Sequence, residues 1–147
     1  SPSRIILDNK LRIPLNSKII KNAKKHSTFI FYNNFNKKKI YKLKKLNVKT
    51  FKLPLDTDKN LDLEQVLIKA KHLGFYRIFL ETGMNLAINF LNKNLVDDLK
   101  LFISNKALGK NGMNNIKGKL NSLLKNKKST VEKVNLFGEK LITYKIN

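Results

Sequence analysis

Short apolar runs alternate with amphipathic stretches along the first half of the chain. The runs Arg4–Asp8, Thr28–Tyr32 and Val48–Leu53 are rich in β-branched and aromatic residues, and polar residues or a proline close each of them. Such runs predict buried strands. Between the second and third runs, Lys37–Leu46 places apolar residues on one side and lysines on the other, which predicts a short amphipathic helix.

The next predicted helix has clear start and stop signals. Asp62 is its expected N-cap, with Gln65 three residues later as a capping-box partner, and Gly74 is its expected C-terminal stop. After the glycine, Tyr76–Leu80 is nearly all apolar. Because a strand that is buried on both faces has this pattern, the segment is predicted to be a fourth, central parallel strand.

The segment Glu81–Gly83 leads directly into another predicted helix, which ends at Asn94, and Leu99–Ile103 is a predicted fifth strand. Regular alternation of strands and helices indicates parallel pairing through right-handed crossovers. This rhythm stops after residue 104, where a loop-rich stretch runs to Gly118 and a short helical patch follows.

The end of the chain predicts a hairpin. Val131–Phe137 and Lys140–Ile146 flank Gly138-Glu139, and strands joined by so short a turn are antiparallel. The predicted fold class is therefore α/β, with a mixed, mainly parallel sheet flanked by helices and a C-terminal antiparallel hairpin. No internal repeat or linker is visible, so residues 1–147 are predicted to form a single domain.

Composition removes several kinds of chemistry. An apolar fraction of 41% in 147 residues suits one globular domain. No apolar run approaches the roughly 20 residues that span a bilayer, and the start does not resemble a signal peptide, so we expect a cytoplasmic protein without a membrane partner.

Cysteine is absent, which excludes disulfides and thiolate catalysis. His26 and His72 lie far apart, so no metal site is expected.

The formal charge of +21 raises the alternative of a basic module that binds nucleic acid. Nearly all of this charge is lysine, which shares A/T-rich codons with the abundant asparagine and isoleucine, so a compositional bias explains it. A module that binds single-stranded nucleic acid also needs exposed aromatic residues among the basic ones. Five phenylalanines instead fall at predicted core positions, namely Phe29, Phe31, Phe79, Phe90 and Phe102. No nucleic-acid partner is expected.

Polar residues follow the predicted parallel strands at Asp8-Asn9, Asn33-Asn34, Pro54-Leu55 and Glu81–Gly83. Ligands of open α/β sheets bind beyond these carboxyl ends. A glycine before a helix lets a ligand approach the backbone, and the helix N-terminus offers N–H groups to a phosphate. No G-x-G-x-x-G or G-x-x-x-x-G-K motif is present, and a plain tight turn beside a solvated glutamate explains this segment equally well.

Four segments resemble the reductase domain of the bifunctional riboflavin biosynthesis deaminase/reductase. Arg4–Lys18 is similar to its R-I-V-L-D-S-x-L-R-x-P-x-x-S-K segment, and Ile78–Gly83 to the segment that contains L-V-E-G-G. Leu91–Asp98 matches L-x-x-x-L-V-D-E, and Leu101–Gly109 matches L-Y-I-A-P-K-L-L-G. The matches occur in the family's order and cover essentially the whole chain.

The resemblance implies a dihydrofolate reductase-like fold and an oxidoreductase. Its reaction is the reduction of 5-amino-6-(5-phosphoribosylamino)uracil, a phosphorylated pyrimidine, to the ribitylamino product, with NADPH as the hydride donor. Glu81 matches a glutamate that contacts substrate, and Asn9 takes the place of a serine near NADPH. The cofactor-binding positions that the resemblance implies are Asn9, Gly83, Met84, Asn85, Leu86, Ala87, Ile88 and Asn89. It assigns no catalytic side chain, and it implies a homodimer.

Departures from the family pattern set limits on these expectations. Thr82 replaces the first glycine of the family's pair, and the family domain begins upstream with a strand and loops that contact substrate and NADPH. The family's zinc deaminase domain is also missing, so we expect a fragment that binds weakly or does not turn over. A dihydrofolate reductase-like enzyme acting on a pteridine is the alternative within this fold. The matches at Leu11–Pro14 and Leu95–Asp97 favour the riboflavin branch.

Overall fold

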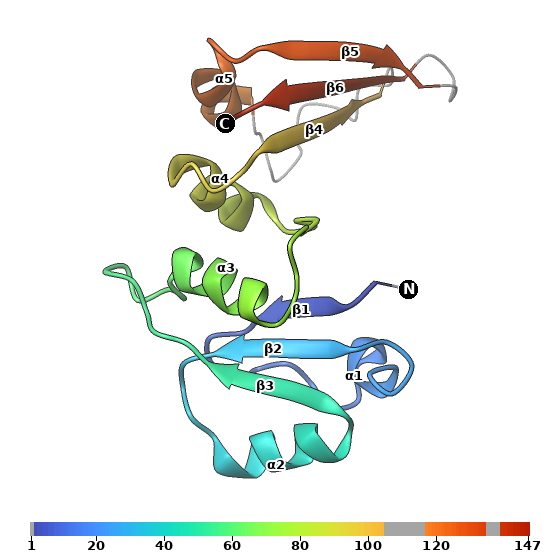
Figure 1. Cartoon of the computed structure of the whole chain (residues 1–147), viewed down its shortest axis with the longest axis vertical. Helices are drawn as coiled ribbons and strands as arrows, with labels where there is room; N and C mark the ends of the chain where they lie inside the picture. The colour runs from blue at the N-terminus through green and yellow to red at the C-terminus, as the bar shows by residue number, and fades with distance from the viewer. Residues whose placement is uncertain (1, 105–116, 135–138) are drawn as a thin grey trace. The chain divides into compact units, whose positions relative to one another are not determined.

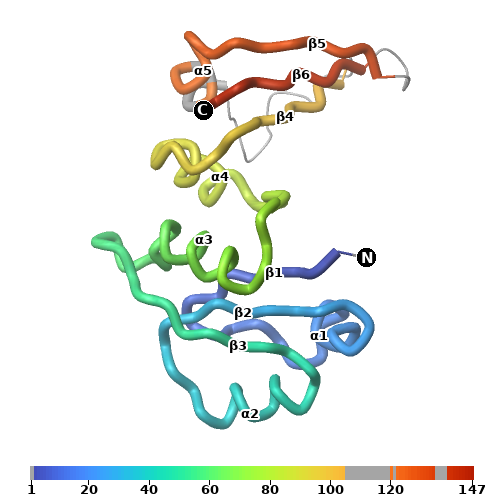
Figure 2. Tube along the Cα trace, viewed as in Figure 1, coloured from blue at the N-terminus to red at the C-terminus, as the bar shows by residue number. Residues whose placement is uncertain are grey.

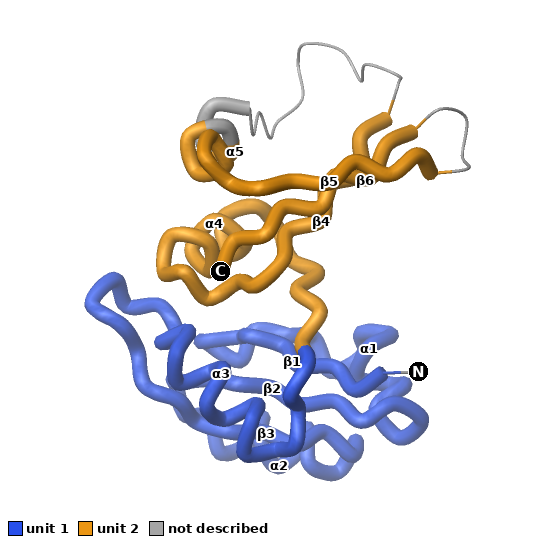
Figure 3. Tube along the Cα trace, turned by 45° about the horizontal axis from the view of Figure 1, so that its top comes forward, with its two compact units in different colours: residues 1–77 blue, residues 78–147 orange. Residues whose placement is uncertain are grey.

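The structure is a computed structural model that describes residues 2–104, 117–134 and 139–147. Figure 1 shows its helices and strands, and Figure 2 the course of the chain. The chain divides into two compact units, residues 1–77 and residues 78–147, which Figure 3 distinguishes by colour. Each unit is described by itself, and a single domain over residues 1–147 stays a prediction.

The first unit contains a parallel sheet of three strands. These are β1 (Arg4–Leu7), β2 (Thr28–Tyr32) and β3 (Val48–Lys52), in the order β1-β2-β3. All five residues of β2 are buried, as expected for a strand with parallel neighbours on both sides and covered faces. The three strands predicted in this part of the sequence are confirmed.

Helices cover both faces of this sheet. α1 (Lys18–Lys21) and α2 (Lys37–Lys45) lie on one side, and α3 (Leu63–His72) lies on the other (Figure 1). Side chains of β2 alternate between the two layers, because successive residues of a strand point to opposite faces. Ile30 packs with the helix pair, whereas Phe31 belongs to the cluster beneath α3.

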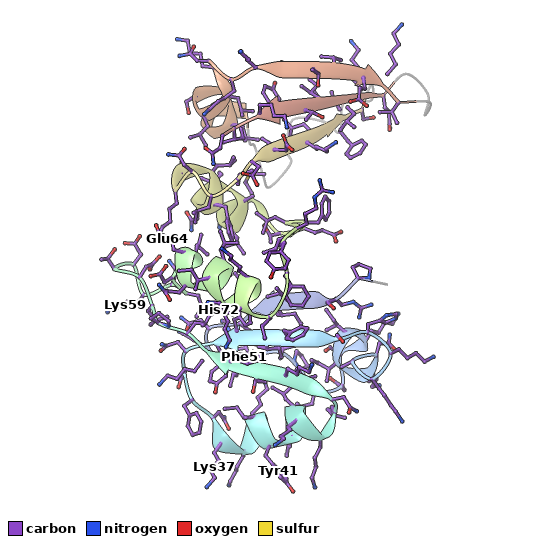
Figure 4. All side chains as sticks on the ribbon, in the orientation of Figure 1. Lys37, Tyr41, Phe51, Lys59, Glu64 and His72 are labelled. Carbon is purple, nitrogen blue, oxygen red and sulfur yellow. The ribbon has the colours of Figure 1, made fainter. Side chains whose placement is uncertain are left out.

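Aromatic rings fill the layer between the sheet and α3. The centroids of Phe29 and Phe75 are 5.2 Å apart and those of Phe31 and Phe51 are 6.0 Å apart, both pairs in edge-to-face contact. Figure 4 shows Phe51 between the sheet and α3, and the Lys69 ammonium lies 4.4 Å from its ring centroid. Each aromatic pair contributes about 0.5–1.5 kcal/mol beyond its buried area, so these pairs stabilise the layer on which α3 packs.

The predicted ends of α3 are confirmed. The Asp62 carboxylate accepts hydrogen bonds from the backbone N–H groups of Glu64 at 3.0 Å and Gln65 at 3.3 Å. Gly74 has φ of +88° just past the helix, where a left-handed residue ends it. In a capping box, the side chain of Gln65 would accept a hydrogen bond from the Asp62 N–H. Here that N–H donates instead to the carbonyl of Pro54 at 3.1 Å.

Replacing this N-cap has a predictable cost. Asp62→Ala is expected to lower the free energy of unfolding by about 1 kcal/mol, because two first-turn N–H groups lose their acceptor. Urea unfolding followed by circular dichroism measures the change. Asp58→Ala is the matched control, since Asp58 is exposed in the preceding loop and caps no helix; an equal loss in both variants would contradict the capping role.

The predicted fourth strand, Tyr76–Leu80, is wrong. The structure has no strand there, and Tyr76 is 81% exposed and Phe79 86% exposed. An apolar run has the composition of a buried strand, but a strand forms only where a neighbouring strand accepts its backbone hydrogen bonds. Within the described residues, no strand pairs with this segment.

In its described residues, the second unit has its own sheet and two helices. Its elements are α4 (Met84–Asn92), β4 (Asp98–Ile103), α5 (Lys117–Leu124), β5 (Ser129–Lys133) and β6 (Lys140–Lys145). The strands follow the order β4-β6-β5 and are antiparallel throughout. The C-terminal hairpin is thus confirmed, although Gly138 and most of the loop predicted up to Gly118 lie outside the described residues.

The predicted fifth strand forms as β4, but its direction was predicted wrongly. It pairs antiparallel with β6 near the end of the chain, instead of joining a parallel sheet. One face of this sheet packs on the helices through Leu99, Leu101 and Tyr144. Phe102, on the opposite face, is 70% exposed, so its predicted core position is wrong, as is that of Phe79.

The other three phenylalanines, Phe29, Phe31 and Phe90, are buried as predicted. In the part of the chain that the structure describes, none of the helices has the length and apolar character that crossing a membrane requires.

Candidate functional site

Asn9 joins three loops at the carboxyl edge of the first unit's sheet. Its carbonyl accepts hydrogen bonds from the N–H groups of Asn33 at 3.1 Å and Asn34 at 2.9 Å. Its side-chain Nδ2 donates to the carbonyl of Lys59 at 3.1 Å, on the loop that Figure 4 labels at Lys59. The polar residues predicted to follow β1 and β2 therefore do lie together at this edge.

These contacts give Asn9 a structural task. Its Nδ2 already holds the 56–60 loop, so the Oδ1 atom and the second amide hydrogen remain for a ligand. The neighbouring Asp8 carboxylate accepts a hydrogen bond of 2.7 Å from the N–H of Ile13, which fixes the turn after β1. Contact between Asn9 and a cofactor stays a prediction.

The glycine turn belongs to the second unit and starts α4. Gly83 is the N-cap residue, with φ of −66° and ψ of 160°, and no side chain caps the helix. The first turn holds no acidic residue, and the first intrahelical bond runs from the N–H of Ala87 to the Gly83 carbonyl at 3.2 Å. The N–H groups of Met84, Asn85 and Leu86 precede this bond, so they point beyond the helix end.

Open space surrounds Gly83. A Cβ atom placed on it would meet no atom of the protein within 4 Å, and its φ is one that every amino acid adopts. The fold therefore does not require glycine at this position. The missing side chain leaves the helix N-terminus accessible, which is what a phosphate group needs in order to reach the backbone. Glu81 is exposed two residues earlier.

Part of the predicted cofactor-binding stretch lines a cavity of about 400 Å³ between α4 and α5. The lining residues are Asn85, Ile88, Asn89, Asn92, Ser122 and Leu123. Three of the predicted residues are thus brought together, whereas Met84, Leu86 and Ala87 do not line this cavity. Asn85, Asn89 and Asn92 recur at the spacing of one helix face, so the sequence held a signal for Asn92 that the motif comparison missed.

Amide groups, rather than acids or bases, dominate this site. The asparagine side chains each supply two donors and an acceptor, and the helix end adds backbone donors. Such a site binds and orients a polar, anionic ligand without being a proton donor or nucleophile itself. Among the described residues, no three histidine or acidic side chains come together in a way that would hold a metal ion.

The first unit is an α/β layer, and the second unit begins with an uncapped, glycine-led helix, a helix end that can bind a phosphate. Comparison with known proteins places this domain more closely. The family described as the RibD C-terminal domain matches residues 1–141. The chain belongs to this family.

Two relatives support the family assignment. The riboflavin biosynthesis protein RibD of Aquifex aeolicus is 29% identical over 143 residues, which cover 97% of this chain and 38% of that protein. RibD of Actinobacillus pleuropneumoniae is 28% identical over 108 residues, which cover 74% of this chain and 28% of the relative. The chain therefore spans about a third of the length of these relatives.

Solved structures confirm the fold class. RibD of Acinetobacter baumannii aligns with a TM-score of 0.63 at 21% identity, over 98% of this chain and 37% of that one. A pyrimidine reductase-like protein of Corynebacterium diphtheriae aligns with a TM-score of 0.68 at 17% identity, over 98% of this chain and 60% of that one. The predicted α/β, dihydrofolate reductase-like fold class is confirmed.

Proposed function

We propose that this chain is the cofactor-binding part of a riboflavin-pathway reductase. In the proposed reaction, NADPH reduces the ribosyl group of 5-amino-6-(5-phosphoribosylamino)uracil to a ribityl chain. Membership of the RibD C-terminal domain family and relatives named as riboflavin biosynthesis proteins support the pathway. The observation that carries the cofactor site is the open space around Gly83 at the start of α4.

In this proposal the cofactor supplies the hydride, and the protein binds and orients the reactants. The N–H groups of the first turn of α4 hold a phosphate of the dinucleotide. Asn85 and Asn89, which line the neighbouring cavity, hydrogen-bond polar groups of the cofactor. The exposed Glu81 carboxylate accepts hydrogen bonds from the substrate. None of these roles needs a shifted pKa or a nucleophile.

Titration of the chain with NADPH, followed by calorimetry, tests the cofactor site. We expect saturable binding, which Asn85→Ala and Asn89→Ala each weaken by about tenfold, because one hydrogen bond to a buried or charged group is worth roughly 1.4 kcal/mol. Asn16→Ala is the matched control, since Asn16 is an exposed asparagine of the first unit. Absence of NADPH binding, or equal weakening by the control, would contradict the proposed site.

The reductase activity needs a separate assay. The substrate and NADPH are mixed with the chain joined to the upstream region that its relatives carry, and NADPH oxidation is followed by absorbance. We expect turnover with the phosphoribosylaminopyrimidine and none with a dihydropteridine. The opposite preference would assign the protein to the pteridine alternative.

A further inference from the structure

A second cavity lies at the other edge of the first unit's sheet, at the amino ends of β2 and β3. Its volume is about 310 Å³, and its lining residues are Ala23, Lys24, Ser27, Thr28, Lys44, Asn47, Val48 and Lys49. Because β1, β2 and β3 are parallel, this edge is opposite to the one that carries Asn9. Nothing in the proposed reductase reaction uses this cavity.

The lining is cationic and rich in hydrogen-bond donors. Lys24 and Lys44 are exposed at the cavity, and no acidic residue lines it. Within the described residues, no ion pair joins either ammonium to a carboxylate. Ser27 adds a hydroxyl and Asn47 adds an amide, and both can donate to an oxyanion.

The C-terminus of α2 at this cavity neutralises only part of the positive charge. The last turn of α2 holds Lys42, Lys44 and Lys45. A helix C-terminus carries the equivalent of about half a negative charge, so it balances less than one of these three lysines. Nearby, burial and then the cations Arg4 and Lys25 lower the pKa of His26. The remaining positive charge therefore has no counterion in the described structure.

Lys49 differs from the other two lysines of the lining. Its ammonium lies 5.2 Å from the ring centroid of Phe29, with which Lys49 is paired across the sheet on the side of α3. This cation–π contact occupies the ammonium on the face of the sheet, away from the helices that form the other side of the cavity. Lys49 is therefore less available to a ligand than Lys24 and Lys44.

We propose that this cavity binds a small phosphorylated ligand, with Lys24 and Lys44 neutralising the phosphate and Ser27 and Asn47 donating hydrogen bonds to it. The volume lies at the lower end of the range of roughly 300–1,000 Å³ for small-molecule sites, which favours a compact ligand over a polymer. Two ammonium groups and two neutral donors match the several acceptor oxygens of a phosphate. All of the lining residues belong to the first unit, and none belongs to the glycine turn.

Titration with inorganic pyrophosphate, followed by amide shifts in NMR spectra, tests this site. We expect saturable shifts confined to residues 23–28 and 44–49. Lys24→Gln and Lys44→Gln should each weaken binding about tenfold, the loss of one hydrogen bond to a charged group. The distant Lys38→Gln removes the same charge and should change affinity less than about twofold, since screened charges at a distance contribute little.

A short single-stranded oligonucleotide separates the two sources of phosphate. We expect Lys24→Gln, Lys44→Gln and Lys38→Gln to weaken oligonucleotide binding to the same extent. Pyrophosphate should still bind its site when the oligonucleotide is present. The proposal is overturned if pyrophosphate gives no saturable shifts, if the Lys24, Lys44 and Lys38 variants lose affinity equally, or if only the oligonucleotide depends on Lys24 and Lys44. Exposed Lys→Gln changes should leave unfolding unaltered, which circular dichroism verifies.

Discussion

Gly83→Val is expected to lower the affinity for NADPH by at least about 100-fold, which corresponds to roughly 2.7 kcal/mol. The valine side chain would occupy the space that adjoins the first N–H groups of α4, where the proposed phosphate must approach. Its Cβ meets no protein atom within 4 Å and the backbone φ is −66°, so the fold should accept it. The loss of binding free energy should therefore exceed any loss of stability.

Calorimetric titration with NADPH measures the affinity, and urea unfolding measures stability in the same variants. Gly83→Ala should fall between the glycine and valine forms, because one methyl group fills less of the space. Valine is a poorer N-cap than glycine, so a stability loss of up to about 1 kcal/mol is expected. Unchanged NADPH affinity in Gly83→Val would remove the glycine turn from the proposed function.

Phe31→Ala should be the most damaging single change to stability, with a loss of about 3–5 kcal/mol. Phe31 is fully buried in β2, where its ring meets Phe51 edge-to-face with centroids 6.0 Å apart. Truncation removes a large apolar surface from the layer beneath α3 and leaves a cavity there. Since small domains are stable by only about 5–15 kcal/mol, the variant should unfold at a much lower urea concentration.

Phe35→Ala is the matched control for this change. It removes the same atoms, but Phe35 is 61% exposed, so its stability should change by no more than about 0.5 kcal/mol. Comparable losses in both variants would show that the buried layer around β2 does not dominate the stability of the first unit.

The sequence was most informative where local pattern and tertiary context agree. β2 was predicted with the bounds it has, because a five-residue buried strand between two parallel neighbours is apolar throughout. The start of α3 was equally predictable, since capping by Asp62 involves residues within one helical turn. Such features need no knowledge of distant parts of the chain.

Pairing between distant segments was not predictable in this way. The composition of residues 99–103 suits a strand in a parallel or an antiparallel sheet. Only the pairing with β6 makes β4 antiparallel. Tyr76–Leu80 has the same apolar composition but no strand beside it in the described structure, and it forms none. Alternation along β4 also decides that Leu101 is covered by helices while Phe102 is exposed.

The candidate site was predicted in part. The turn before α4 was recognisable from a glycine that follows an apolar run, and the structure confirms that a helix begins there. The part of the cavity that comes from α5 was missed, because Ser122 and Leu123 reach it only through the packing of α5 beside α4. Sequence spacing reports one helix face, but it does not report which helix lies against it.

The freedom around Gly83 has a consequence for mutational surveys. Where a glycine is demanded by backbone geometry, its replacements are seen as reduced abundance in the cell, because the misfolded chains are degraded. At position 83 the chain tolerates a side chain, so substitutions should yield normal amounts of protein. A survey that scores expression alone would class this position as nearly neutral, and only an assay of the proposed NADPH binding would register these substitutions.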